Sequence, residues 1–418
     1  MSSFRHIRMS AHLLIFSTTL CFAHENAVVD HHDMIHIDKT LTLAQVITHT
    51  VDKFPAYIIN AALKDEANAL QRRGDSWLAG VPSIAMRYQG DFVADNIGSR
   101  EIEAELELPL WNWGQRSAGQ AIAEHANTAA EKQSSVLTLE VAGLVRQALW
   151  NINLESLGYD QAQYILQISE KMLNKIKRRV DLGDLPRSDL LLAQSDHLQK
   201  RSLLIQAEAE MMHARKSYIN LTQTTAIPAD YTEQQSTLTE ISQDHPKLSA
   251  INSIIQRKQA ELKWVESTGS GQTSLIFGGK SERDELGSEP IESISLEISI
   301  PFGGSAHLAP EIALANIELT TALAERASIF RQLEKQHHEA KHALEVTHAE
   351  LEIAHELKEI AESHLKMARL SFSAGEINLM DLLKIQARSH NTIRHSKEHG
   401  ILLKKNIALY NQSVGVIP

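Results

Sequence analysis

The fold of this chain is decided by two stretches that repeat each other, VDLGDLPRSDLLLAQ (residues 180–194) and FSAGEINLMDLLKIQ (residues 372–386). In both stretches a helical pattern runs into a glycine, Gly183 or Gly375, and a second helical pattern follows. Glycine is the usual residue where a helix ends and the backbone reverses. Each stretch therefore predicts the turn of a helical hairpin, and the chain contains two such turns.

The repeat extends well beyond these turns, and from Pro109 onward its spacing is constant. The pairs separated by 192 residues are Gly183 with Gly375, Asp189 with Asp381, and Pro109 with Pro301. A constant period indicates that one structural unit is used twice. We therefore expect two similar halves, residues 41–230 and residues 231–418, and a function that needs such units in pairs.

Upstream of each turn, a short region has the periodicity of β-strands. Residues 101–108 alternate strictly between glutamates and apolar side chains, and residues 83–92 and 293–300 alternate in the same way. Strict alternation is typical of a strand with one apolar and one polar face. The run 273–280 is rich in glycine and is the expected partner of 293–300. Each half therefore predicts one β-hairpin.

Helical patterns flank both hairpins. Residues 41–77 and 238–266 are expected to be helices interrupted at Pro55 and Pro246. After Pro109 and Pro301 the helical pattern continues for about 65 residues, which corresponds to roughly 100 Å.

Apolar residues recur at every seventh position in the long helical segments. One set is Val346, Ile353, Ile360 and Met367, flanked by Ala354, Ala361 and Ala368, and the other is Leu191, Leu198, Ile205, Met212 and Ile219. A sustained period of seven predicts helices packed side by side along their length.

The start of the chain has the features of a secretory signal. Residues 1–23 combine a basic start, an apolar run and a small residue at Ala23. Cleavage there would remove Cys21, the only cysteine. Residues 24–40 are then expected to be a flexible, histidine-rich N-terminus. Elsewhere no stretch reaches 18 apolar residues, so no membrane-spanning helix is expected.

The charge balance argues against one class of partner. The formal net charge of -11 disfavours nucleic acid, since duplex binding requires a basic face. The four predicted strands are too few to close a transmembrane barrel, which needs at least about eight. Open sheet edges are not tolerated in lipid. We therefore expect several copies to assemble.

These features resemble one family. The double repeat, the stretch PLWNWGQRSAGQAIAEHA (residues 109–126) and the stretch PFGGSAHLAPEIALAN (residues 301–316) are similar to the TolC-like outer-membrane efflux proteins. The resemblance covers about residues 41–414. The stretch PFGGS (residues 301–305) and the histidine content look most like members paired with heavy-metal pumps. It implies a mainly α fold with a small β part, as a homotrimer whose twelve strands form an outer-membrane β-barrel continued by a periplasmic α-helical barrel.

The resemblance also implies a role and partners. The chain would be the passive outer-membrane channel of a tripartite efflux system in a Gram-negative bacterium, working with a periplasmic adaptor and an inner-membrane pump of the RND type. The cargo would be metal cations. The alternatives are drug efflux or type I protein secretion with the same fold, or a soluble periplasmic coiled-coil scaffold. No cofactor is expected.

Several residues are candidates for function. The expected pore lining is Glu101, Glu103, Glu105, Glu107 and Glu297, which would attract cations if the apolar strand face meets lipid. The alternative interpretation is that a water-filled pore needs only polar side chains, and that glutamate is one of several residues that would serve. The tip residues expected to contact the adaptor are Gly183, Asp184, Leu185, Gly375, Glu376 and Ile377.

Two further groups are assigned by their positions. Asp189 and Asp381 are expected to cap the helices that return from the tips. Four tryptophans lie just outside the strands, where they could form an interfacial belt or cap a soluble core: Trp77, Trp111, Trp113 and Trp264.

The 21 histidines do not form a metal motif of defined spacing. His24, His31, His32 and His36 lie near aspartates, and His338 and His342 are four residues apart on one helix face. A solvated polar surface is the preferred interpretation. No phosphate loop, nucleophile elbow or zinc-protease motif is present, so the chain is not expected to be an enzyme.

Overall fold

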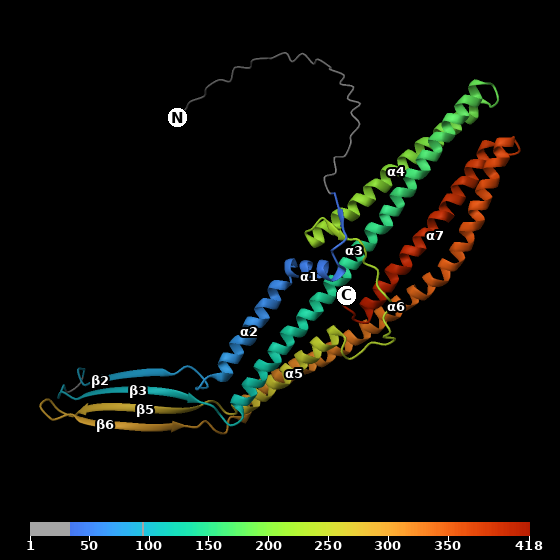
Figure 1. Ribbon diagram of the computed structural model, residues 1–418. Coiled ribbons are helices and arrows are strands. Elements are labelled where there is room, and N and C mark those ends of the chain that lie inside the picture. Colours follow the sequence, from blue (N-terminus) through green and yellow to red (C-terminus); the bar gives the residue numbers. More distant parts are fainter. Residues whose placement is uncertain (1–33, 94–95) are drawn as a thin grey trace, which may run out of the picture.

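A computed structural model describes residues 34–93 and 96–418 of the chain. It has the shape of a long rod, with a four-stranded sheet at one end and two helical hairpins reaching toward the other (Figure 1). The predicted signal lies outside the described residues, and so do His24, His31 and His32 of the predicted N-terminus.

The described part of the predicted flexible N-terminus contains a strand. Strand β1 (His36–Asp38) pairs in parallel with β4 (Ala226–Pro228), and His36 lies opposite Ala226. The Asp38 carboxylate then accepts hydrogen bonds from the backbone and the hydroxyl of Thr40, at 2.8 and 2.7 Å. The prediction of flexibility was therefore wrong for these residues. A strand of three residues is too short to show a periodic pattern in the sequence, and its partner strand lies far away along the chain.

The first predicted helical segment is broken where Pro55 predicted a break. Helix α1 (Leu43–Lys53) begins with a capping box between Thr42 and Gln45, and α2 (Tyr57–Asp75) follows the interruption. In the second half, helix α5 (Pro246–Thr268) begins at Pro246 itself. The predicted start at residue 238 was wrong, since proline suits the first helical position and residues 229–245 are irregular.

The four predicted strands form one antiparallel sheet. They are β2 (Ser83–Gly90), β3 (Arg100–Leu110), β5 (Thr273–Arg283) and β6 (Ile291–Ser299), in the order β2-β3-β5-β6. The contact between β3 and β5 joins the hairpins of the two halves, with Glu105 opposite Gly278. Strands β2 and β6 are the two edges of this sheet.

The long helices also match the prediction. Helix α3 (Gln115–Asp181) has 67 residues and α6 (Ser305–Ala374) has 70. Each turns back into a shorter helix, α4 (Arg187–Thr222) or α7 (Leu379–Ser413). The two hairpins meet through α3 and α7, so α4 and α6 lie on the outside of the group (Figure 1).

The heptad pattern of α6 is confirmed, but a different stripe forms the core. Ala354, Ala361 and Ala368 are buried along the half of α6 that packs on α7. The larger residues of the neighbouring stripe, such as Ile353 and Ile360, are exposed in the single chain. Small side chains allow the two helices to approach closely. Among the described residues, the larger apolar stripe has no partner that covers it.

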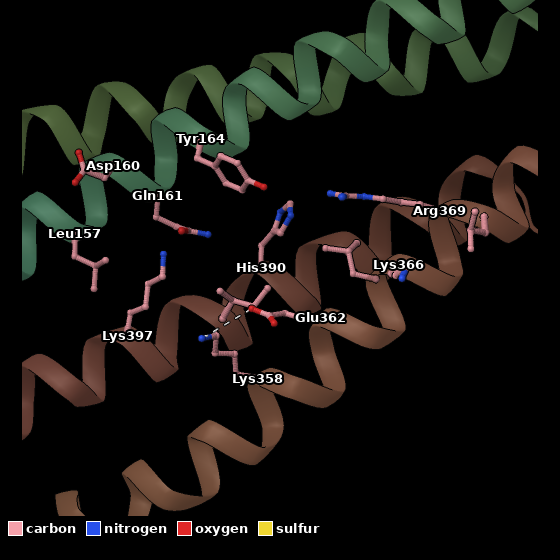
Figure 2. A pocket seen from close by; sticks show the side chains of 13 residues that line it. Leu157, Asp160, Gln161, Tyr164, Lys358, Glu362, Lys366, Arg369, His390 and Lys397 are labelled. Atoms are coloured by element: carbon pink, nitrogen blue, oxygen red, sulfur yellow. Dashed lines mark ion pairs between the residues drawn. The ribbon is translucent and has the colours of Figure 1, made fainter.

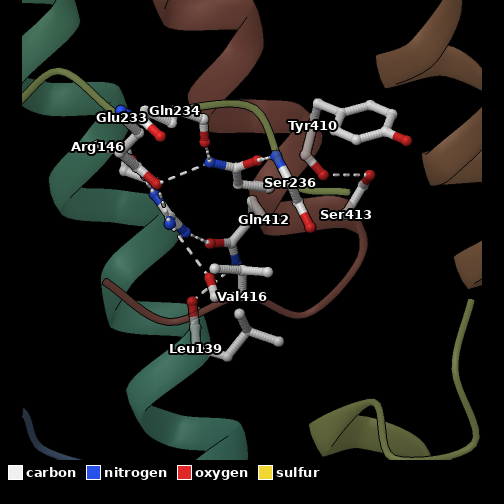
Figure 3. Close-up of polar contacts among 10 residues, drawn as sticks. Leu139, Arg146, Glu233, Gln234, Ser236, Tyr410, Gln412, Ser413 and Val416 are labelled. Carbon is white, nitrogen blue, oxygen red and sulfur yellow. Dashed lines mark hydrogen bonds and ion pairs between the residues drawn. The ribbon is translucent and has the colours of Figure 1, made fainter. Parts of the chain in front are cut away.

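A polar cluster fastens the two halves together near the middle of the rod (Figure 3). Arg146 of α3 donates to Glu233 of the segment between the halves, to Gln412 of α7, and to the carbonyl of Val416. Asn411 donates to Glu233 and to the carbonyl of Gln234. One buried guanidinium of the first half thus binds both the connecting segment and the C-terminal residues.

None of the helices within residues 34–93 and 96–418 has the length and apolar character needed to cross a membrane.

Candidate functional site

The sheet has one polar and one apolar face, as the alternation predicted. Directly opposed residues of antiparallel strands lie on the same face. Glu105 lies opposite Ala85 and Gly278, and Glu107 lies opposite Ser83 and Ile276. Glu101 and Glu103 share this face because they have the same parity along β3. The strand register therefore places the four glutamates of β3 in one row.

Glu297 lies on the same face through the next strand. It pairs with Ile276 of β5, which pairs with Glu107 of β3. By repeat spacing Glu297 corresponds to Glu105, but in the sheet it is aligned with Glu107. The predicted set of five acidic residues is thus brought together on one face by the register.

Two cations on this face were missed by the sequence reasoning. Arg87 lies 3.3 Å from Glu103, and Lys280 lies 3.1 Å from Glu101 and 3.0 Å from Glu282. The signal was available, since Arg87 is in the polar phase of its strand. The acidic residues still outnumber these two cations, so the face keeps a negative charge.

The opposite face of the sheet is apolar and uncovered. Its exposed apolar side chains are Ile84, Met86, Tyr88, Ile102, Leu106, Phe277, Ile294, Leu296 and Ile298. Ile294 is 92% exposed, and no helix of the described part of the chain covers this face. Contiguous apolar surface of this kind marks a site of contact with another protein or with lipid.

Both sides of the chain, like the apolar face of the sheet, lack a partner among the described residues. Strands β2 and β6 each have one unpaired side within the described residues. The outer helices carry exposed apolar stripes: Leu191, Leu198 and Ile205 on α4, and Ile353, Ile360 and Met367 on α6. An unpaired strand edge offers hydrogen bonds to another strand. The two sides of the chain therefore present surfaces that another copy could complete.

The two helical turns have the same hydrogen bonds, one repeat apart. Asp184 N–H donates to Arg179 O at 2.8 Å, and Glu376 N–H donates to Ser371 O at 2.9 Å. Gly183 and Gly375 have φ angles of 83° and 78°, as this type of helix end requires. The predicted role of the two glycines in the reversal is confirmed.

The tip residues differ in exposure. Gly183, Asp184, Gly375 and Glu376 are exposed, whereas Leu185 and Ile377 are half-buried. Leu185 packs on a cluster of Ile176, Ala193 and Leu379 that joins the two hairpins. Contact with an adaptor thus remains a prediction, to which the exposed acidic residues are better suited than Leu185.

The assignment of Asp189 and Asp381 as caps was wrong in position. The residue that caps α7 is Asn378, whose side chain accepts a hydrogen bond from the Asp381 N–H at 2.8 Å. Pro186 precedes α4, without a side-chain cap bond. Both aspartates lie in the first helical turn instead, where a negative charge still interacts favourably with the helix dipole.

The four tryptophans fall into two pairs. Trp77 and Trp113 are exposed, as a belt requires. Trp111 and Trp264 instead pack edge to face, with ring centroids 5.8 Å apart, and the Trp111 Nε1–H donates to Ser76 O at 3.1 Å. Trp111 and Trp264 therefore fasten the end of β3 to α5 and to the residue after α2. The belt role stays a prediction, to which the exposed Trp77 and Trp113 are better suited.

The chain is similar to known proteins in its structure and not in its sequence. Its sequence matches no family model and no curated protein. Its structure is similar to CusC, in crystal structures concerned with transmembrane channel formation, with a TM-score of 0.74, 13% identity, and coverage of 90% of this chain and 92% of that one. The chain has the fold of a TolC-like channel protein.

Two further solved structures have the same fold. The CmeC outer membrane channel of Campylobacter jejuni gives a TM-score of 0.71 at 13% identity, covering 89% of this chain and 85% of that one. The outer membrane protein VceC of Vibrio cholerae gives 0.73 at 13% identity, covering 90% and 97%. The TolC-like fold thus extends over nearly the whole of each chain, and it is retained with little sequence identity.

A cavity of about 770 Å³ lies between the two hairpins of this fold, and the sequence did not predict it (Figure 2). Tyr164 of α3 faces His390 of α7 and Arg369 of α6 across it. His390 is buried, and this burial, together with the charge of Arg369, lowers its pKa to about 4. His390 is therefore neutral at physiological pH, and its Nε2 has no hydrogen-bond partner among the described residues.

Among the described residues, the histidines belong to no metal centre with three or more protein ligands. Within the described ranges, no group of three or more His, Cys, Asp or Glu residues is placed to hold a metal ion. His338 and His342 do share a helix face, with stacked rings whose centroids are 6.5 Å apart. His24, His31 and His32 lie outside the described residues.

Proposed function

We propose that three copies of this chain form a passive channel in the outer membrane of a Gram-negative bacterium. The observation that carries the proposal is the sheet, which has an uncovered apolar face, an acidic face and two open edges. In lipid, such a sheet is stable only when its edges are paired with other strands. The TolC-like fold supports the same conclusion.

The number of copies follows from strand arithmetic. A transmembrane barrel needs at least about eight strands, and one chain supplies four. Strands alternate in direction across the sheet, so β6 of one copy can pair with β2 of the next without a break in the antiparallel pattern. We propose a ring of three copies with twelve strands, as the resemblance to the TolC-like proteins implies.

The same head-to-tail contact is possible along the helices. The exposed stripe on α4 would meet the exposed stripe on α6 of the neighbouring copy, and both would then be buried. A repeated heterologous contact closes into a ring when its rotation allows. The helices would then continue the pore as a tunnel into the periplasm.

The proposed partners are a periplasmic adaptor and an inner-membrane pump of the RND type. The exposed residues at the helical turns, Asp184 and Glu376 above all, are the proposed contacts for the adaptor. The channel itself would perform no chemistry, and the pump would supply the energy.

For the cargo, we propose metal cations. The acidic sheet face would line the pore if the apolar face meets lipid. Six acidic and two basic side chains lie on this face in each copy: Glu101, Glu103, Glu105, Glu107, Glu282 and Glu297, with Arg87 and Lys280. A ring of carboxylates attracts cations and repels anions.

Conductance across planar bilayers tests this proposal. The reversal potential in a salt gradient should indicate cation preference for the purified protein. Replacing Glu101, Glu103, Glu105 and Glu107 by glutamine should reduce that preference, while replacing the tip residue Glu376 by glutamine should not. A protein that forms no pores would contradict the channel itself, whereas pores with unchanged selectivity in the quadruple variant would contradict only the acidic lining.

A further inference from the structure

Helix α7 carries a second histidine pair with i,i+4 spacing, and its geometry is unusual. The Nε2 atoms of His395 and His399 share a hydrogen bond of 2.9 Å, and their rings meet edge to face with centroids 4.2 Å apart. His395 is exposed to solvent, whereas His399 is only 5% exposed. Two ring nitrogens thus converge at a point that a dissolved ion can reach.

A carboxylate on the neighbouring helix orients the buried ring. Glu350 Oε2 of α6 lies 3.6 Å from the Nδ1 of His399, and this Nδ1 has no other partner among the described residues. The distance is too long for a hydrogen bond, but the negative charge favours the tautomer with its proton on Nδ1. The lone pair of His399 Nε2 is then directed at His395.

The first histidine pair shows that spacing alone does not create this arrangement. His338 and His342 on α6 are also four residues apart, yet their rings are stacked at an interplanar angle of 14°, with centroids 6.5 Å apart. No contact between their nitrogen atoms is present in the described part of the chain. Of these two pairs, His395 and His399 are the one that brings two nitrogens together.

We propose that His395 and His399 bind one divalent transition-metal ion through their two Nε2 atoms. Imidazole is a preferred ligand of copper, nickel and zinc, and a carboxylate facing the far nitrogen is the common companion of a metal-bound histidine. In the metal-free chain the His395 Nε2–H would donate to the His399 Nε2. Metal binding replaces this hydrogen bond, and the proton of His395 then lies on Nδ1, so both rings bind as neutral imidazoles. Water completes the coordination, because His395 is exposed and the described residues offer no third ligand in a metal-holding group.

The distance between the nitrogens favours a particular ion. With metal–nitrogen bonds of about 2.0 Å, nitrogens 2.9 Å apart subtend an angle of about 90° at the metal. This is the angle between neighbouring ligands in a tetragonal site, the preference of Cu²⁺. Tetrahedral zinc would need about 3.3 Å between the nitrogens. The geometry and the general order of divalent affinities both select Cu²⁺ over Zn²⁺.

The site lies on the helices and away from the sheet. It lies where α6 packs on α7, and it requires neither the sheet nor a particular cargo. The proposal therefore holds or fails independently of the channel function.

Copper titration of the full-length protein, purified in detergent and stripped with chelator, tests the site. Calorimetry counts the bound Cu²⁺ ions, and electron paramagnetic resonance detects their nitrogen ligands. Because other histidines also bind copper, the decisive quantity is the difference between variants. His395→Ala should lose one Cu²⁺ per chain and the signal of a two-imidazole site.

Two further variants sharpen the test. Glu350→Gln should keep the stoichiometry but weaken the affinity by about 10- to 100-fold, the usual effect of removing a carboxylate behind a metal-bound histidine. The matched control, His338→Ala with His342→Ala, should keep the full number of Cu²⁺ ions. His395 is exposed, so its replacement is compatible with folding.

Either of two outcomes would overturn the proposal. One is a His395→Ala protein with the same copper count and the same spectrum as the unmodified protein. The other is an equal loss in the His338/His342 control, which would mean that any pair with this spacing binds copper. A site that takes Zn²⁺ more tightly than Cu²⁺ would overturn the assigned tetragonal geometry.

Discussion

Arg146 and Glu233 form a buried, bidentate ion pair, with Nε and Nη2 donating to the two carboxylate oxygens at 2.8 and 2.7 Å. Arg146 belongs to a long helix of the first half, and Glu233 belongs to the segment that leads into the second. Arg146 is only 1% exposed. The pair therefore determines how the two halves are held together at the middle of the rod.

Removing one partner of this pair should destabilise the protein strongly. Glu233→Ala leaves a guanidinium buried without its counter-ion, at an expected cost of about 3–5 kcal/mol. The exposed pair Lys335–Glu339, at 3.8 Å, is the control, and Lys335→Ala should cost less than about 1 kcal/mol. Thermal unfolding followed by circular dichroism measures both. An equal loss of stability in the two variants would contradict a role for the buried pair in holding the halves together.

His245 should make stability depend on pH. Burial, and then the charge of Lys247, lower its pKa to about 4, and its Nδ1 accepts the Lys247 N–H at the start of α5. An unfolded histidine has a pKa of about 6.5. Between these values the unfolded chain binds more protons, so the stability contribution is complete above pH 6.5 and falls as the pH decreases toward 4.

The variant His245→Asn isolates this effect. Asparagine preserves the helix cap but does not titrate. Melting temperatures between pH 8 and pH 4.5 should fall less steeply for the variant, with a difference of up to about 3 kcal/mol in unfolding free energy at the acid end. Parallel curves for the two proteins would contradict the assignment.

Glycines at the turns and inside the helices should respond in opposite ways to alanine. Gly183 and Gly375 have positive φ angles, so alanine is strained there although space is available. Gly158 and Gly400 lie inside helices with nothing near an added Cβ. Alanine at the turns should lower the free energy of unfolding by about 1 kcal/mol, and alanine at the helical positions should raise it by about 0.5–1 kcal/mol.

The two pairs of tryptophans should behave differently toward lipid. Trp77 and Trp113 are exposed beside the strands, whereas Trp111 and Trp264 pack on each other. Brominated lipid should quench the fluorescence of single-tryptophan variants that retain Trp77 or Trp113. Variants that retain Trp111 or Trp264 should be quenched much less. Equal quenching of all four would contradict the separation.

Sequence reasoning was most successful where a pattern is long or repeated. The alternation around Glu105 predicted the strand and its faces, and the 192-residue offset predicted two identical turns at Gly183 and Gly375. These features depend on local periodicity, which a single sequence displays directly.

It was least successful where a feature depends on how distant segments meet. Nothing near Trp111 in the sequence indicates that Trp264 covers it, and the capping role of Asn378 was assigned to a neighbouring aspartate. The converging nitrogens of His395 and His399 share their spacing with the stacked pair on α6. Only ring orientation, which the packing of α6 on α7 determines, distinguishes the two pairs.

The most direct test of the proposed channel is the mass of the native particle. Light scattering of the purified protein, corrected for bound detergent, counts the chains in each particle. The account predicts three chains that stay in solution only with detergent or lipid, because the apolar sheet face is then covered. A single chain that remains soluble in plain buffer would contradict the trimer, the pore and its acidic lining together.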